Sequence, residues 1–247
     1  MLTEQELIHY SRHIILPEID EAGQRRLKDA SVLIVGMGGL GSPVAMYLAA
    51  AGIGHLLIAD HDIVEQSNLQ RQIAHNLPSV GNSKVLSAKT TLEQLNPWIK
   101  VTTITQKFIA DSHNELIAKV DLVVDCSDNY TTRFALNKSC IAYGKPLVSG
   151  TAMRFNGQVA VFNQDAHSAC YHCLYQSDNF NTESCDDQGI LAPVVGVIGS
   201  LQATEVLKII LKIGQTLDSR LLIYDGLKAQ FSDLKLVKDP ACKVCGQ

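Results

Sequence analysis

Short apolar runs alternate with amphipathic stretches over the first 150 residues of the chain. Short, mostly buried strands are predicted at 31–35, 55–59, 101–105, 121–125 and 146–149. Apolar positions at helical spacing predict helices between them, at 41–51, 82–96, 112–119 and 131–143. Buried strands that alternate with helices are typical of a parallel sheet covered on both faces. We therefore predict an α/β fold with a Rossmann-like, mostly parallel sheet.

The pattern differs on either side of this region. Residues 1–30 are predicted to form amphipathic helices, which Pro17 divides into two. After residue 150, strands at 158–162 and within 220–235 indicate an antiparallel extension. The polar stretch 163–188 between them is predicted to be a long loop.

No internal repeat or clean linker interrupts the chain. We expect a single domain over 1–247 with three parts: N-terminal helices (1–30), a central part (31–150), and an antiparallel, cysteine-bearing part (151–247).

One helix, predicted within 190–211, is the most apolar segment. Glu205, Lys208 and Lys212 recur there at helical spacing and form a polar stripe. Such a stripe disfavours a membrane span, and residues 1–6 lack the apolar stretch of a secretory signal. We expect a soluble protein with this helix in its core, located in the cytoplasm.

The composition is that of a globular protein, with 46% hydrophobic and 19% charged residues. The formal net charge of −4 provides no basic field for nucleic acid or anionic membranes. We therefore expect neither a nucleic-acid nor a membrane partner.

A glycine motif, Gly36-x-Gly38-x-x-Gly41, lies between a predicted strand and a predicted helix. Small residues let a backbone approach a phosphate, and a helix N-terminus favours its charge. Asp60 ends the next strand, where a carboxylate can accept hydrogen bonds from ribose hydroxyls. The central part is therefore predicted to bind a nucleotide, although the glycines do not distinguish NAD, FAD and ATP.

Three polar residues follow Asp60: Asn68, Arg71 and Lys84. Arginine binds phosphate oxygens in pairs and lysine supplies a point charge, which suits a reacting phosphate. Each residue alone is typical of a solvated surface, and their shared position after the glycine loop is what predicts a triphosphate site.

Asp128 and Asn129 follow another predicted parallel strand. Ligands of open α/β sheets bind at the carboxyl ends of strands, so Asp128 could hold Mg²⁺. The alternative is that Asp128 or Asn129 caps the following helix.

Four of the seven cysteines form two pairs, Cys170-x-x-Cys173 and Cys242-x-x-Cys245. Two such pairs are typical of a tetrahedral structural zinc site, with His172 as a lesser ligand candidate. The remaining three are Cys126 and Cys140, which are predicted to lie in the core, and Cys185. Cys185 lies in a polar loop beside acidic residues that disfavour a thiolate, so the residues alone favour a non-catalytic role.

Taken together, the motifs GMGGLG, SNLQRQ, DCSDN, CYHCL, GVIGSLQATE and CKVCG resemble the prokaryotic ubiquitin-activating-enzyme-like family. Its members adenylate the sulfur carriers of molybdopterin synthase and of thiamine synthesis. The resemblance implies that the C-terminal glycine carboxylate of a ubiquitin-like carrier ending in Gly-Gly attacks the α-phosphate of ATP. It also implies that the acyl-adenylate then accepts sulfur from a separate persulfide donor.

The resemblance also assigns roles to residues. It implies phosphate contacts at Gly39 and its neighbours, ribose contact at Asp60, triphosphate contacts at Asn68, Arg71 and Lys84, and Mg²⁺ at Asp128 beside Asn129. Arg12 corresponds to a family arginine that reaches the active site of the other subunit in a homodimer. Cys185 corresponds to a loop cysteine that bonds covalently to the carrier in thiamine-type members.

Several alternatives stay open. The segments CYHCL, PACKVCG and 148–152 slightly favour a carrier of the molybdopterin type over the thiamine type. An NAD-dependent oxidoreductase would share the glycine loop and Asp60, but it would leave Arg71, Lys84 and the cysteine pairs unexplained. A non-catalytic nucleotide-sensing module held by zinc is the third class.

Overall fold

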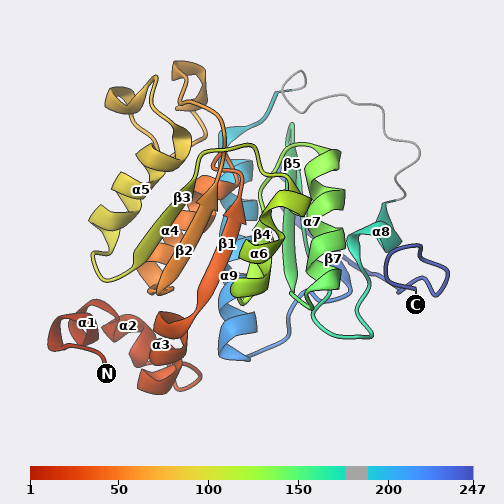
Figure 1. The fold of residues 1–247 in the computed structure, drawn as a ribbon, viewed down its shortest axis with the longest axis horizontal. Coiled ribbons are helices and arrows are strands. Elements are labelled where there is room, and N and C mark those ends of the chain that lie inside the picture. The colour runs from red at the N-terminus through yellow and green to blue at the C-terminus, as the bar shows by residue number, and fades with distance from the viewer. Residues whose placement is uncertain (176–188, 247) are drawn as a thin grey trace.

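A computed structural model describes residues 1–175 and 189–246. Within them, eight strands form one sheet in the order β3-β2-β1-β4-β5-β6-β7-β8 (Figure 1). Five neighbours run parallel: β1 (Ser31–Val35), β2 (His55–Ala59), β3 (Lys100–Ile104), β4 (Leu122–Asp125) and β5 (Leu147–Met153). Three more continue the sheet antiparallel: β6 (Asn156–Phe162), β7 (Arg220–Asp225) and β8 (Gln230–Lys235). The predicted parallel sheet with an antiparallel extension is confirmed.

Helices cover both faces of the sheet (Figure 1). Val32 and Ile34 of β1 pack on one face, in the core shared with α3 (Asp20–Asp29), α4 (Gly41–Ala51), α5 (Lys84–Leu95) and α9 (Ala192–Leu211). Leu33 and Val35 point to the opposite face, toward α6 (Ala110–Lys119) and α7 (Tyr130–Ala142). Successive strand residues alternate between faces, so a fully apolar strand requires two helical layers.

The N-terminal segment forms three helices rather than the two expected: α1 (Glu4–His9), α2 (Ser11–Ile14) and α3. The additional break lies at Tyr10, ahead of Pro17. The buried Tyr10 ring packs beside Gly52, and its hydroxyl accepts a hydrogen bond from Asn96 Nδ2 at 2.7 Å. Tertiary contacts with the end of α5 therefore set this break, which no proline or glycine marks.

Two further expectations need correction. Strand β5 continues to Met153, four residues past the predicted end, because its backbone pairs with β6 up to the Met153–Asn156 pair. Within the predicted loop at 163–188, residues Tyr171–Leu174 form the short helix α8. The Tyr171 side chain is buried between Phe134 and Phe162, and this packing stabilises the turn.

Helix α9 is long and apolar enough by composition to cross a membrane, yet it packs along the sheet against α4, β5 and β6. One residue of its polar stripe, Glu205, is buried inside the protein. Glu205 is 4% exposed, accepts a hydrogen bond from the Leu217 amide and pairs with Lys208. The helix therefore has the features of a core helix, as its stripe predicts.

Candidate active site

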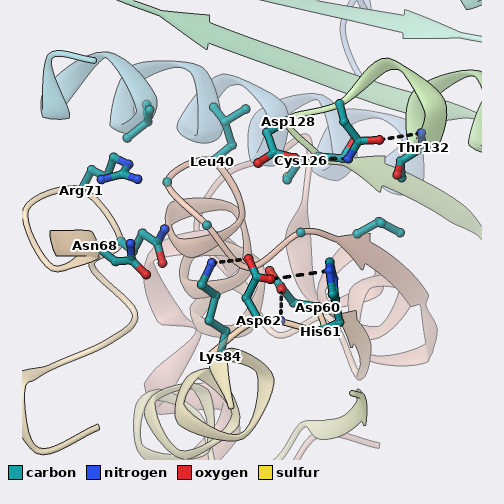
Figure 2. Close-up of a pocket in the computed structure, with 18 of the residues that line it drawn as sticks. Leu40, Asp60, His61, Asp62, Asn68, Arg71, Lys84, Cys126, Asp128 and Thr132 are labelled. Atoms are coloured by element: carbon teal, nitrogen blue, oxygen red, sulfur yellow. Dashed lines mark hydrogen bonds and ion pairs between the residues drawn. The ribbon is translucent and has the colours of Figure 1, made fainter. Parts of the chain in front are cut away.

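An open cavity of about 630 Å³ lies at the carboxyl ends of β1, β2 and β4. The sheet order reverses at β1, whose neighbours are β2 and β4. Ligands of open α/β sheets bind at such a switch point. The walls come from the glycine loop, the segment after β2, the start of α5 and the β4–α7 loop (Figure 2).

The glycine loop is possible only because two of its positions lack a side chain. Gly36 has a φ of +96°, and a Cβ there would lie 2.6 Å from the Cys126 carbonyl oxygen. A Cβ on Gly41 would lie 1.9 Å from the Gly36 carbonyl oxygen. Gly36, Gly38 and Gly39 line the cavity, whereas Gly41 supports it from behind by letting α4 begin against the loop.

Backbone amides are the main polar groups of this loop. In the described part of the chain, the amides of Gly38, Gly39 and Leu40 donate to no protein acceptor. Helix α4 begins directly after them, and its N-terminus carries partial positive charge. The loop can therefore bind an anion such as a phosphate.

Asp60 lies beside the loop, as predicted. Its Oδ2 accepts a hydrogen bond from the Met37 amide at 2.7 Å, and its Oδ1 accepts one from the Asp62 amide at 2.9 Å. A carboxylate has about four acceptor sites, so Asp60 retains capacity for a ribose hydroxyl while it anchors the loop to β2.

Asn68, Arg71 and Lys84 all line the cavity, so the structure brings the predicted triphosphate residues together. The Asn68 side chain closes a 3₁₀ turn (Gln66–Asn68) by accepting from the Glu65 amide, and Arg71 Nη1 donates to the Ser67 carbonyl at 3.2 Å. Figure 2 shows these side chains on one side of the cavity and Asp128 on the other.

The Lys84 ammonium is paired with a residue that the sequence analysis missed. Lys84 is 7% exposed and donates to Asp62 Oδ2 at 2.8 Å (Figure 2). Burial alone would raise the pKa of Asp62, but the hydrogen bond and charge of Lys84 outweigh it and leave that pKa below its usual value. Asp62 thus holds the lysine in an ionised pair at the cavity wall. The sequence signal that could have pointed to Asp62 is its position two residues after Asp60, the predicted ribose-binding residue.

The β4–α7 loop shows which of its two polar residues caps α7. Asn129 Oδ1 accepts from the Thr132 amide at 2.9 Å and caps α7. Asp128 is exposed at the cavity, where its Oδ1 accepts from Asn129 Nδ2 at 3.2 Å. The cap therefore belongs to Asn129, and the Asp128 carboxylate is available to a cation.

A buried network supports this loop from below. Asp125 is fully buried and accepts from the hydroxyls of Ser127 and Ser149, at 2.6 and 2.9 Å. The Arg133 guanidinium donates to the Ser127 carbonyl at 2.6 Å. Cys126 lies within this network, and burial raises the pKa of its thiol well above the usual value. Cys126 and Cys140 are core residues, as predicted.

The cysteine pairs converge although they are far apart in the chain. Sγ–Sγ distances are 3.7 Å for Cys170–Cys242, 3.8 Å for Cys170–Cys173 and 3.4 Å for Cys173–Cys245. A tetrahedron with Zn–S bonds of about 2.3 Å has edges of about 3.8 Å. The four thiols therefore fit a zinc ion.

His172 lies at the edge of this cluster. Its Nδ1 is 3.9 Å from Cys242 Sγ, and its ring contacts Phe134. The four sulfur atoms already make a complete tetrahedral ligand set.

One predicted site residue, Arg12, lies away from the cavity. Arg12 is exposed on α2 and does not line the cavity of its own chain. Figure 1 shows α2 near the amino-terminal ends of the strands, away from the glycine loop. Cys185 lies outside the described residues, and its role stays a prediction.

Comparison with known proteins decides the family. Residues 10–244 match the ThiF family. The chain belongs to the ThiF family. It is 44% identical over 246 residues to the molybdopterin-synthase adenylyltransferases of Salmonella typhimurium and Escherichia coli, covering 100% of this chain and 99% of each relative. It is 45% identical to the adenylyltransferase and sulfurtransferase MOCS3 of Dictyostelium discoideum, of which it spans 58%. The resemblance read from the motifs is confirmed.

Solved structures agree on the fold. Escherichia coli MccB with AMPCPP and MccA aligns with a TM-score of 0.84 at 24% identity, covering 100% of this chain and 75% of MccB. MccB with ATP aligns with a TM-score of 0.83 at 25% identity, covering 96% of this chain and 73% of MccB. The chain thus shares its fold with about three quarters of MccB.

Proposed function

We propose that this chain is an ATP-dependent adenylyltransferase that activates the C-terminal glycine carboxylate of a ubiquitin-like sulfur carrier in molybdenum cofactor biosynthesis. The observation that carries the proposal is the meeting of open loop amides, Arg71 and Lys84 at one cavity in a ThiF-family chain. The full-length relatives named molybdopterin-synthase adenylyltransferase support the choice of carrier. A thiamine-type carrier is the alternative.

In the proposed reaction, a carboxylate oxygen of the carrier attacks the α-phosphorus of ATP. A new P–O bond forms, the bond from the α-phosphorus to its bridging oxygen breaks, and pyrophosphate leaves with that electron pair. Both reactants are anionic, so their approach needs positive charge and fixed alignment. The amides of Gly38 and Gly39, together with Arg71 and Lys84, would supply that charge, and Asp60 would accept from the ribose.

Asp128 is the residue that we propose for Mg²⁺. Its carboxylate is exposed at the cavity and takes no part in capping α7. Magnesium is bound through one or two carboxylates together with substrate phosphates, and when bound it would neutralise triphosphate charge. Asp128 would hold the magnesium ion on the side of the cavity away from Lys84.

The experiment that tests the function is exchange of labelled pyrophosphate into ATP, with Mg²⁺ and carriers of the molybdopterin and thiamine types. We expect exchange that depends on one carrier and disappears when its terminal glycine is removed. ATP binding without exchange on any carrier would indicate a nucleotide-sensing module instead. Tight binding of NADH with weak binding of ATP–Mg²⁺ would indicate an oxidoreductase.

We also propose a homodimer in which Arg12 of one copy acts at the cavity of the other, because Arg12 is exposed and lies away from its own cavity. Arg12→Ala and Lys84→Ala should each inactivate the protein. A mixture of the two variants should regain activity, because a mixed dimer has one site with both residues intact. A mixture as inactive as its components would contradict the shared site.

The proposal also includes a structural zinc ion, a separate sulfur donor and a cytoplasmic location. The spacing of the four thiols supports a structural zinc ion held by Cys170, Cys173, Cys242 and Cys245. We propose that sulfur reaches the acyl-adenylate from a separate persulfide donor. A cytoplasmic location is supported by the packing of α9 in the core.

A further inference from the structure

The Met37 residue of the glycine loop is buried and held from both sides. Its amide donates to Asp60 Oδ2 at 2.7 Å, and its carbonyl oxygen lies 3.1 Å from His75 Nε2. This contact between the Met37 carbonyl and His75 is not part of the hydrogen bonding of a helix or a strand. His75 is absent from the motifs that first indicated the site, and it does not line the cavity.

The hydrogen bonds of His75 fix which ring nitrogen carries the proton. The Met37 carbonyl can only accept, so the imidazole must donate through Nε2. The other nitrogen, Nδ1, lies 3.0 Å from the Ser87 hydroxyl on α5 and can accept from it. The ring is 7% exposed, so both bonds are shielded from water. The adjacent Ala74 carbonyl accepts from the Thr91 hydroxyl at 2.7 Å, which attaches this segment to α5.

The direction of the Met37 carbonyl sets the direction of the next amide, that of Gly38. The Met37–Gly38 peptide is trans, so its C=O and N–H point in opposite directions. With the carbonyl directed at His75 in the interior, the Gly38 N–H is directed away from it. Gly38 lines the cavity, and its amide has no acceptor among the described residues.

The alternative orientation of this peptide would harm nucleotide binding. Gly36 and Gly38 flank Met37, and glycine permits backbone rotations that other residues resist. A rotated peptide would turn the Met37 carbonyl oxygen toward the phosphates and remove one donor. The loop therefore needs a partner that keeps this carbonyl in the interior.

We propose that His75 is a positioning residue that holds the Met37–Gly38 peptide so that the Gly38 N–H donates to the triphosphate. The identity of the triphosphate as that of ATP rests on the proposed function. His75 touches no substrate in this arrangement and acts through the loop. The Ser87 hydroxyl assists because it donates a hydrogen bond to Nδ1. This bond favours the tautomer with the proton on Nε2, which the contact with Met37 requires.

The test compares two amide replacements. In His75→Gln the side-chain amide reaches the position of Nε2 and can still donate to Met37. In His75→Asn the amide reaches only the position of Nδ1. Calorimetry with the full chain should give the affinities of ATP–Mg²⁺ and of adenosine, with melting temperatures as the folding control. Adenosine lacks phosphates and therefore reports on the rest of the cavity.

We expect His75→Asn to weaken ATP binding by about 10-fold or more, the range for a lost hydrogen bond to a charged group, and to leave adenosine binding within about twofold. His75→Gln should restore most of the ATP affinity. Ser87→Ala should give a smaller loss in the same direction, and it decides the question if His75→Asn fails to fold.

Two results would overturn the assignment. One is unchanged ATP affinity in His75→Asn, or in Ser87→Ala where that variant has to decide. The other is an equal loss of ATP and adenosine affinity, which a merely structural role predicts. Because binding is measured without a carrier, the assignment and the proposed function fail separately. Absent pyrophosphate exchange in the wild-type protein would remove the function while a selective loss of ATP affinity would still establish the role of His75.

Discussion

The nucleotide cavity and the cysteine cluster are held in place in different ways. The cavity is shaped by the fold itself, because Gly36 and Gly41 allow close backbone packing and Asp60 anchors the loop to β2. In the cluster, Cys170 and Cys242 are 72 residues apart, and the described tail after β8, residues 236–246, forms no helix or strand. Close packing of the backbone therefore shapes the cavity, whereas side-chain contacts between distant cysteines bring the tail to the 170–173 segment.

The largest expected effect concerns chemistry at the cavity. Lys84→Ala should lower carrier-dependent pyrophosphate exchange by about 100-fold or more, because a preorganised charge contact to the reacting phosphate is lost. Lys89→Ala is a matched control, since Lys89 lies on the same helix and pairs only with Glu93 at the surface among the described residues. Exchange kinetics and thermal melting of both variants check this expectation. Equal rates for the two variants would rule out a role for Lys84 in turnover.

Substitutions in the cysteine cluster should lower the stability of the protein, whereas Lys84→Ala should lower its turnover. Cys170→Ser or Cys242→Ser should release zinc and lower the melting temperature by about 5 °C or more, since 1 kcal/mol corresponds to about 2–4 °C in a protein of this size. Metal analysis and calorimetry provide the measurement. His172→Ala is the control and should retain the metal, because four sulfur ligands complete the site. Full zinc content in the serine variants would contradict the assignment.

Adding a methyl group at a glycine tests how closely the backbone of the glycine loop is packed. Gly41→Ala should destabilise the protein by about 3 kcal/mol, at the upper end for overpacking, because its Cβ would meet the Gly36 carbonyl oxygen. Gly196→Ala in α9 meets open space and should stabilise by about 0.5–1 kcal/mol. Urea unfolding of both variants tests this pair, and a similar midpoint for both would contradict the close packing of the loop.

The smallest expected effect is a dependence of stability on pH. Burial lowers the pKa of His75 below its ordinary value of 6.5, so the folded protein keeps this ring neutral where the unfolded chain binds a proton. Stability should therefore be complete above about pH 6.5 and decline as the pH falls below it. Denaturant unfolding between pH 5 and 8 should show a shallower decline for His75→Gln than for the wild-type chain. Identical slopes would remove His75 as a source of this dependence.

Much of the cavity could be predicted from sequence because its parts follow one another along the chain. The glycine loop, Asp60, Asn68, Arg71 and Lys84 succeed each other within two βα units. The carboxyl ends of neighbouring parallel strands meet at one edge of a sheet, so local pattern was sufficient to place them together. The roles of Asp62 and His75 were missed because they depend on partners 22 and 38 residues away.

The mostly parallel sheet and the grouping of the cysteines could be predicted from the sequence, because apolar periodicity and motif spacing are local properties of the chain. The strand order, with its reversal at β1, came only from the structure. Three features depend on the folded structure: Asn129 rather than Asp128 caps α7, Tyr10 breaks the first helix, and the Met37 carbonyl faces His75. Each of these outcomes is a choice between partners that local sequence permits equally. Burial decides among them, because a polar group removed from water needs a specific partner at a specific distance.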